Sequence, residues 1–102
     1  MVDKGYKQNS GTIMNKQEQV IKLIDKAISE VEDEIQLHKK GIGNNGSEPQ
    51  LQRIKDELII MKDKLNPQKY MPGYSRAIVD SWDFDSKLGL SLLEVVNKYK
   101  QL

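Results

Sequence analysis

The sequence predicts an all-α fold: an antiparallel helical hairpin, with a long first helix and a shorter second one, closed by a short helix or turn and a C-terminal helix. Apolar residues recur at three- and four-residue steps in three separate stretches, as the helix period requires. Segments rich in Gly, Asn and Pro separate these stretches. The chain of 102 residues is the size of one domain. We therefore expect a single three- to four-helix bundle over residues 13–102 and a flexible tail over residues 1–12, which hold too few apolar groups to offset the entropy of ordering.

The first helix is predicted from about Asn15 to Lys40. Its apolar stripe ends at the single histidine of the chain and consists of Val20, Ile24, Ala27, Ile28, Val31, Ile35 and His38. Asn15 is a suitable N-cap with Glu18 three residues later, and two lysines lie at the negative end of the helix dipole before Gly41. We expect His38 to be a structural residue that is partly exposed.

An acidic run lies within this helix and comprises Glu30, Glu32, Asp33 and Glu34. Such runs in an amphipathic helix are typical of a solvated face. We therefore expect these carboxylates to point away from the core, where a basic partner could contact them.

The second helix follows a connector at residues 41–48. The connector reads GIGNNGSE and is predicted to be mobile, because no regular element tolerates three Gly and two Asn in eight positions. Ser47 begins an S-x-x-Q capping box with Pro in the first turn. The apolar positions then form a stripe at alternating steps of three and four, and they are Leu51, Ile54, Leu58, Met61 and Leu65. The Asn-Pro pair at residues 66–67 ends this helix.

The last third of the chain must cover the part of the long helix that the shorter one leaves open. Residues 66–74 carry Pro and Gly together with two Tyr and a Met, which indicates an extended linker lying on the hairpin. Residues 75–82 suit a short helix capped by Ser75, although the Ala-Ile-Val run would also suit a strand. Three N-cap candidates precede a final helix, and they are Asp83, Asp85 and Ser86.

The composition excludes several kinds of chemistry. The chain has no Cys and one His, so it can form no disulfide and no thiolate zinc site, and it has no cysteine nucleophile. A net charge of +1 gives no global field toward nucleic acid or membranes. Neither a secretory signal nor a run of about 18 apolar residues is present, so we expect a cytoplasmic protein with no membrane segment and no cofactor. The excess of Lys over Arg is typical of AT-rich coding and indicates a low-GC bacterium or its phage.

Residues 70–85 combine aromatic and charged side chains and include the only Trp, the only Phe and one of the two Arg. Aromatic residues and Arg dominate recognition surfaces, since they bury large areas with few rotors and pair well with carboxylates. The candidate partner-binding residues are Tyr70, Tyr74, Arg76, Asp80, Trp82, Asp83 and Asp85. The alternative is that Trp82 and Phe84 close the end of the hairpin, while two aspartates cap the last helix.

These observations favour a small non-enzymatic protein that regulates another protein by binding it through residues 70–85, an inhibitor or immunity-type protein being one version. One alternative is a nucleic-acid-associated regulator, for which the chain offers no basic stripe. A weaker alternative is a divalent-metal-dependent enzyme using Asp80, Asp83 and Asp85, although the spacing lacks the turn-forming Gly of an EF-hand loop. Because the expected core is thin, a homodimer is also considered.

Overall fold

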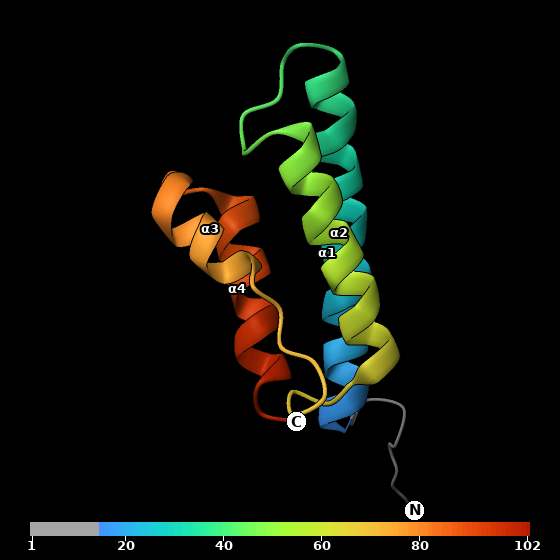
Figure 1. Cartoon of the computed structure of the whole chain (residues 1–102). Helices are drawn as coiled ribbons and strands as arrows, with labels where there is room; N and C mark the ends of the chain where they lie inside the picture. Colours follow the sequence, from blue (N-terminus) through green and yellow to red (C-terminus); the bar gives the residue numbers. More distant parts are fainter. Residues whose placement is uncertain (1–14) are drawn as a thin grey trace, which may run out of the picture.

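The computed structural model describes residues 15–102; the predicted tail lies outside this range. Within it the chain forms helices and connecting turns without a strand, so the all-α prediction is confirmed (Figure 1). The helices are α1 (Lys16–Lys39), α2 (Glu48–Lys64), α3 (Tyr74–Ser81) and α4 (Lys87–Tyr99). The segment that could have been a helix or a strand is therefore helix α3.

Helices α1 and α2 form the predicted antiparallel hairpin, and α4 packs antiparallel along α1 (Figure 1). Two ion pairs lie at the surface across the hairpin, with only Lys55 half-buried: Lys62 Nζ is 2.7 Å from Asp25 Oδ1, and Lys55 Nζ is 2.9 Å from Glu32 Oε2. Exposed pairs of this kind contribute little to stability. The association of the helices therefore depends mainly on the apolar side chains between them.

Three helices begin at polar residues that bind the first free N–H groups, as predicted for two of them. Asn15 and Glu18 form a full capping box at α1, with the Glu18 N–H donating to Asn15 Oδ1 at 2.8 Å. Ser47 caps α2 by accepting from the Gln50 N–H at 3.3 Å. Of the three candidates before α4, Ser86 is the cap. The prediction that Ser75 caps α3 is wrong, because the helix already begins at Tyr74. Its N-cap is Gly73, which has no side chain that could accept from the first N–H groups of the helix.

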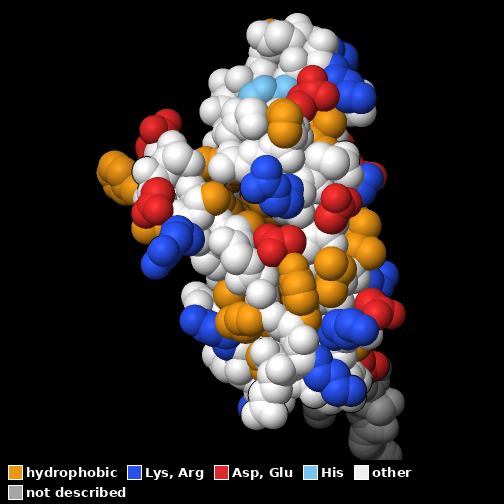
Figure 2. Space-filling model, viewed as in Figure 1, with side chains coloured by type: hydrophobic (Ala, Val, Ile, Leu, Met, Phe, Trp, Pro, Cys, Tyr) orange, Lys and Arg blue, Asp and Glu red, His pale blue; other side chains and the backbone are white. Residues whose placement is uncertain are grey.

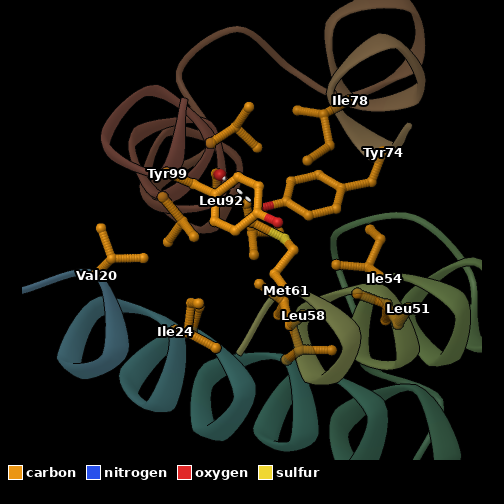
Figure 3. Close-up of a cluster of buried hydrophobic side chains, with 14 of the residues drawn as sticks. Val20, Ile24, Leu51, Ile54, Leu58, Met61, Tyr74, Ile78, Leu92 and Tyr99 are labelled. Atoms are coloured by element: carbon orange, nitrogen blue, oxygen red, sulfur yellow. Dashed lines mark hydrogen bonds between the residues drawn. The ribbon is translucent and has the colours of Figure 1, made fainter. Parts of the chain in front are cut away.

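The core lies where α1, α2 and α4 meet, and α3 covers one end of it (Figure 3). Its buried apolar side chains are Val20, Ile24, Ala27, Val31, Ile35, Leu51, Ile54, Leu58, Met61, Tyr74, Ile78, Trp82, Leu92, Val95, Val96 and Tyr99. The predicted stripes of the first two helices thus face this core. Burial of such side chains is the main stabilising term for a bundle of this size.

Two tyrosine hydroxyls join α3 and α4 to the rest of the bundle. Tyr74 donates to the carbonyl oxygen of Leu92 at 2.8 Å, and the Tyr99 hydroxyl lies 2.8 Å from the carbonyl oxygen of Tyr70 and 3.0 Å from that of Asn66. The Tyr74 contact joins α3 to α4, and the Tyr99 contacts hold the linker between α2 and α3 against the end of α4. Because Tyr70 and Gly73 also bind Glu57 of α2, the prediction that this linker lies on the hairpin is confirmed.

The linker is also held by Glu57 of α2. The carboxylate oxygen Oε2 accepts from the Tyr70 hydroxyl and from the Gly73 N–H, both at 2.9 Å. Burial, and then the hydrogen bond to Glu57, raise the pKa of Tyr70 from 10.0 to about 12. Burial, followed by the charge of Glu57, likewise raises the pKa of Tyr74.

These shifts predict a loss of stability at high pH. A group whose pKa is raised by folding contributes stability that is fully present below its ordinary pKa and is lost as the pH rises through the folded value. The free energy of unfolding should therefore fall between pH 10.0 and about 12, as measured by urea unfolding at a series of pH values. Tyr70→Phe should make this fall shallower, and an unchanged slope in the variant would show that Tyr70 is not a source of it.

Candidate interaction surface

The structure divides the predicted binding residues between the core and the surface. Tyr74 and Trp82 are buried and Tyr70 is half-buried, so these three rings are structural. The charged members are exposed on α3 and on the turn to α4, and they are Arg76, Asp80, Asp83 and Asp85. The packing alternative concerns Trp82 and Phe84, and Trp82 is buried as that alternative expects, whereas the charged candidates lie at the surface.

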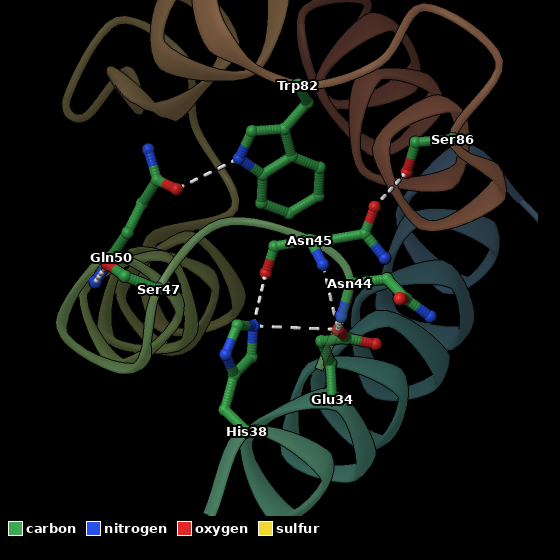
Figure 4. Close-up of polar contacts among 8 residues, drawn as sticks. All are labelled: Glu34, His38, Asn44, Asn45, Ser47, Gln50, Trp82 and Ser86. Atoms are coloured by element: carbon green, nitrogen blue, oxygen red, sulfur yellow. Dashed lines mark hydrogen bonds and ion pairs between the residues drawn. The ribbon is translucent and has the colours of Figure 1, made fainter. Parts of the chain in front are cut away.

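Trp82 closes the end of α3 against the first turn of α2. Its indole Nε1–H donates to Gln50 Oε1 at 2.9 Å, and the side chain is 9% exposed (Figure 4). The predicted capping box would have turned the Gln50 side chain back to the Ser47 backbone. Instead, the glutamine oxygen accepts from a residue 32 positions further along the chain, which fixes α3 relative to α2.

Phe84 does not close the end of the hairpin, contrary to the packing alternative for this residue. Its side chain is 95% exposed, and Val79 and Leu90 nearby are 68% and 55% exposed. In Figure 2, hydrophobic atoms project from the corner where α3 turns into α4, at the upper left, between acidic side chains. We define the corner surface by Val79, Asp80, Asp83, Phe84, Asp85 and Leu90.

A hollow of about 140 Å³ opens between α3 and α4 at this corner. The buried or half-buried side chains of Ile78, Trp82 and Leu93 line it together with Val79 and Phe84. Pockets for drug-sized ligands are larger, roughly 300 to 1,000 Å³. The corner hollow is therefore of the size that takes a single side chain.

No protein-family model, curated protein or solved structure matches the chain. None of the helices between residues 15 and 102 is long and apolar enough to cross a membrane. Because function depends on the site and not on the fold, it has to be argued from the side chains described above.

The three aspartates of the corner surface have no basic partner in the part of the chain that the structure describes. The ion pairs of that part lie on α1 and α2 instead. Residues 79–90 contain three Asp and one Lys, a net charge of −2. Over residues 15–102 no group of three or more His, Asp or Glu is arranged to hold a metal ion, so nothing in the geometry supports the metal-site alternative for these aspartates.

Sequence reasoning missed the role of Glu34, which lies on α1 and binds the connector. The prediction that the acidic run points into solvent is wrong for Glu34, which is buried, with 7% exposure. It is also wrong for Glu30, which is half-buried and accepts from Ser91 Oγ at 3.0 Å. Glu34 Oε2 accepts from the backbone N–H groups of Asn44 and Asn45 at 2.7 and 2.9 Å (Figure 4). The signal was present in the spacing, since position 34 lies three residues after Val31 and therefore on the buried stripe.

The connector between α1 and α2 is held in place, in contrast to the mobile segment that its composition predicts. His38 Nε2 lies 2.7 Å from the Asn45 carbonyl oxygen and must donate, because a carbonyl only accepts. Asn45 Oδ1 accepts from Ser86 Oγ at 2.8 Å. Gly43 packs on the His38 ring so closely that a Cβ would overlap it. Through these hydrogen bonds, Asn45 of the connector links the end of α1 to the N-cap of α4.

Proposed function

We propose that this chain is a non-enzymatic cytoplasmic protein that regulates another protein by binding it through the corner surface. The observation that carries the proposal is the near-complete exposure of Phe84 beside an apolar hollow. Burying a phenylalanine side chain is worth roughly 1.5 to 3 kcal/mol, so a partner that covers it gains affinity. Exposed aromatic residues next to a pocket are typical centres of binding hot spots.

The rigid support beneath the corner also favours binding. Trp82 is hydrogen-bonded to α2, and Ser86 is hydrogen-bonded to the connector through Asn45. Both contacts fix the turn that carries Phe84, so less conformational entropy is lost when a partner docks. A preorganised turn of this kind suits recognition.

The charge of the corner favours a protein over a nucleic acid. Nucleic acids bind through their phosphates, which need Lys and Arg. The corner surface carries three aspartates, and its flanking sequence has a net charge of −2. These carboxylates would repel a phosphate backbone, and they would attract the basic side chains of a protein.

Phe84→Ser tests the proposal. The tagged wild-type chain should retain a partner from a lysate of its native cells, and the variant should retain at least about tenfold less, as expected for a hot-spot residue. Ile59→Ser is the matched control, because Ile59 is also an exposed apolar residue, 48% exposed, but lies on α2. It should retain the partner like the wild type.

Both variants should unfold at the same temperature as the wild type, since neither replaced side chain is buried. Equal retention by wild type and Phe84→Ser would contradict the proposal. Equal loss in both variants would contradict it as well, because binding would then not be specific to the corner.

A further inference from the structure

The chemistry of the corner surface indicates what kind of partner segment it binds. We propose that the partner presents an amphipathic, positively charged segment, with one large apolar side chain in the corner hollow and Lys or Arg side chains against Asp80, Asp83 and Asp85. This inference rests on the proposed function and specifies the partner of the same surface.

The size and lining of the hollow suit one apolar side chain of a partner. A cavity of about 150 Å³ takes a benzene molecule, and the corner hollow measures about 140 Å³. Its inner wall is formed by Ile78, Trp82 and Leu93. A leucine, a methionine or an aromatic side chain would fill it and at the same time contact Phe84 at its edge.

The aspartates at and next to the hollow favour basic residues in the partner: Asp83 lines the hollow, and Asp80 and Asp85 directly follow the lining residues Val79 and Phe84 in the chain. Asp80 belongs to α3, and Asp83 and Asp85 belong to the turn, so the carboxylates lie on either side of Phe84 in the sequence. All three are exposed, and no ion pair within residues 15–102 neutralises them. Complementary charge at the rim of an interface selects partners and speeds their association.

A second copy of this chain is a poorer occupant of the surface. In a two-fold dimer the same patch meets itself, so the three aspartates of one copy would face those of the other. Like charges brought together across an interface are unfavourable. The charge pattern therefore selects a basic partner over self-association through this corner.

Three synthetic peptides of 16 residues test the partner class. The first has a helical Leu face and a Lys face, the second carries Glu in place of every Lys, and the third has the composition of the first in an order without an apolar face. The amide resonances of residues 78–90 should shift on titration with the first peptide, and affinity should fall as salt is added. The second and third peptides should bind at least about tenfold more weakly.

Matched triple variants separate the local from the global effect of charge. Asp80→Asn, Asp83→Asn and Asp85→Asn together should weaken binding of the first peptide about tenfold, as the loss of three exposed ion pairs implies. The control replaces exposed aspartates of α1 and α2, and its substitutions are Asp33→Asn, Asp56→Asn and Asp63→Asn. Each triple variant raises the formal net charge from +1 to +4, but the control should bind nearly like the wild type.

Several outcomes would overturn the inference. They are equal binding of the Glu peptide, shifts centred outside the corner, equal losses in the two triple variants, and a wild-type dimer in sedimentation that Phe84→Ser dissociates. If Phe84→Ser loses the cellular partner while the Lys peptide binds no better than the Glu peptide, the proposed function stands and only the partner class fails. If Phe84→Ser keeps the cellular partner, both fail.

Discussion

Trp82→Ala is expected to lower the free energy of unfolding by about 3 kcal/mol, the largest single-residue effect considered for this chain. The substitution removes the largest side chain at the junction of α3 with α2 and leaves a cavity that a short helix cannot collapse to fill. It also removes the hydrogen bond to Gln50 Oε1. The midpoint of thermal unfolding, followed by circular dichroism, should fall by roughly 10 to 20 °C in a domain of this size.

Trp82→Phe provides the control for this substitution. It keeps most of the buried ring but no longer donates to Gln50, so about half of the loss is expected. A loss below about 1 kcal/mol for Trp82→Ala, the range of an ordinary surface change, would mean that the indole does not join α3 to the bundle.

Glu34→Ala is expected to lower the free energy of unfolding by about 2 kcal/mol. The carboxylate accepts from two backbone N–H groups of the connector, and without it both must turn to water. The connector should open as a result. Hydrogen exchange at the amides of Asn44 and Asn45 should therefore accelerate, and this rate is the measurement that separates loop opening from general destabilisation.

Two further variants sharpen this prediction. Both hydrogen bonds reach the same oxygen, Oε2, so the amide oxygen of Glu34→Gln can still accept them. We therefore expect Glu34→Gln to lose less free energy of unfolding than Glu34→Ala, but still some, because hydrogen bonds to a neutral acceptor are weaker than those to a carboxylate. Asp33→Ala changes the exposed neighbour on the same helix and should stay within about 0.5 kcal/mol of the wild type. Protected Asn44 and Asn45 amides in Glu34→Ala would show that the carboxylate does not hold the connector.

The helices could be predicted from the sequence because the signals for them are local. The apolar stripe of α1 and the capping box at Asn15 depend on residues within two turns of each other, and they gave its ends to within one residue. The same holds for the start of α2 at Ser47. Periodicity and capping chemistry are sufficient for these elements.

The candidate site could be predicted only in part, because its geometry depends on contacts between distant segments. The sequence indicated residues 70–85, which overlap the corner surface, but Phe84 lies in a turn that has no periodicity, so its apolar character alone suggested burial. Asn45 and Ser86 are 41 positions apart, and no local pattern in either segment predicts the hydrogen bond between them. The burial of Glu34 could have been predicted, because its position lies on the buried stripe of α1. A buried carboxylate needs hydrogen-bond donors, and the free N–H groups of the glycine-rich connector that follows are candidates.

The most direct test of the proposal that the corner binds a protein is site-specific photo-crosslinking in the native cells. A photoreactive phenylalanine analogue replaces Phe84 in one version of the chain and Ile59 in a second. Both positions are exposed, so the analogue should not disturb the fold. We expect a discrete adduct of higher mass from position 84 and none from position 59. The absence of an adduct at position 84, or the same adducts from both positions, would contradict the proposal.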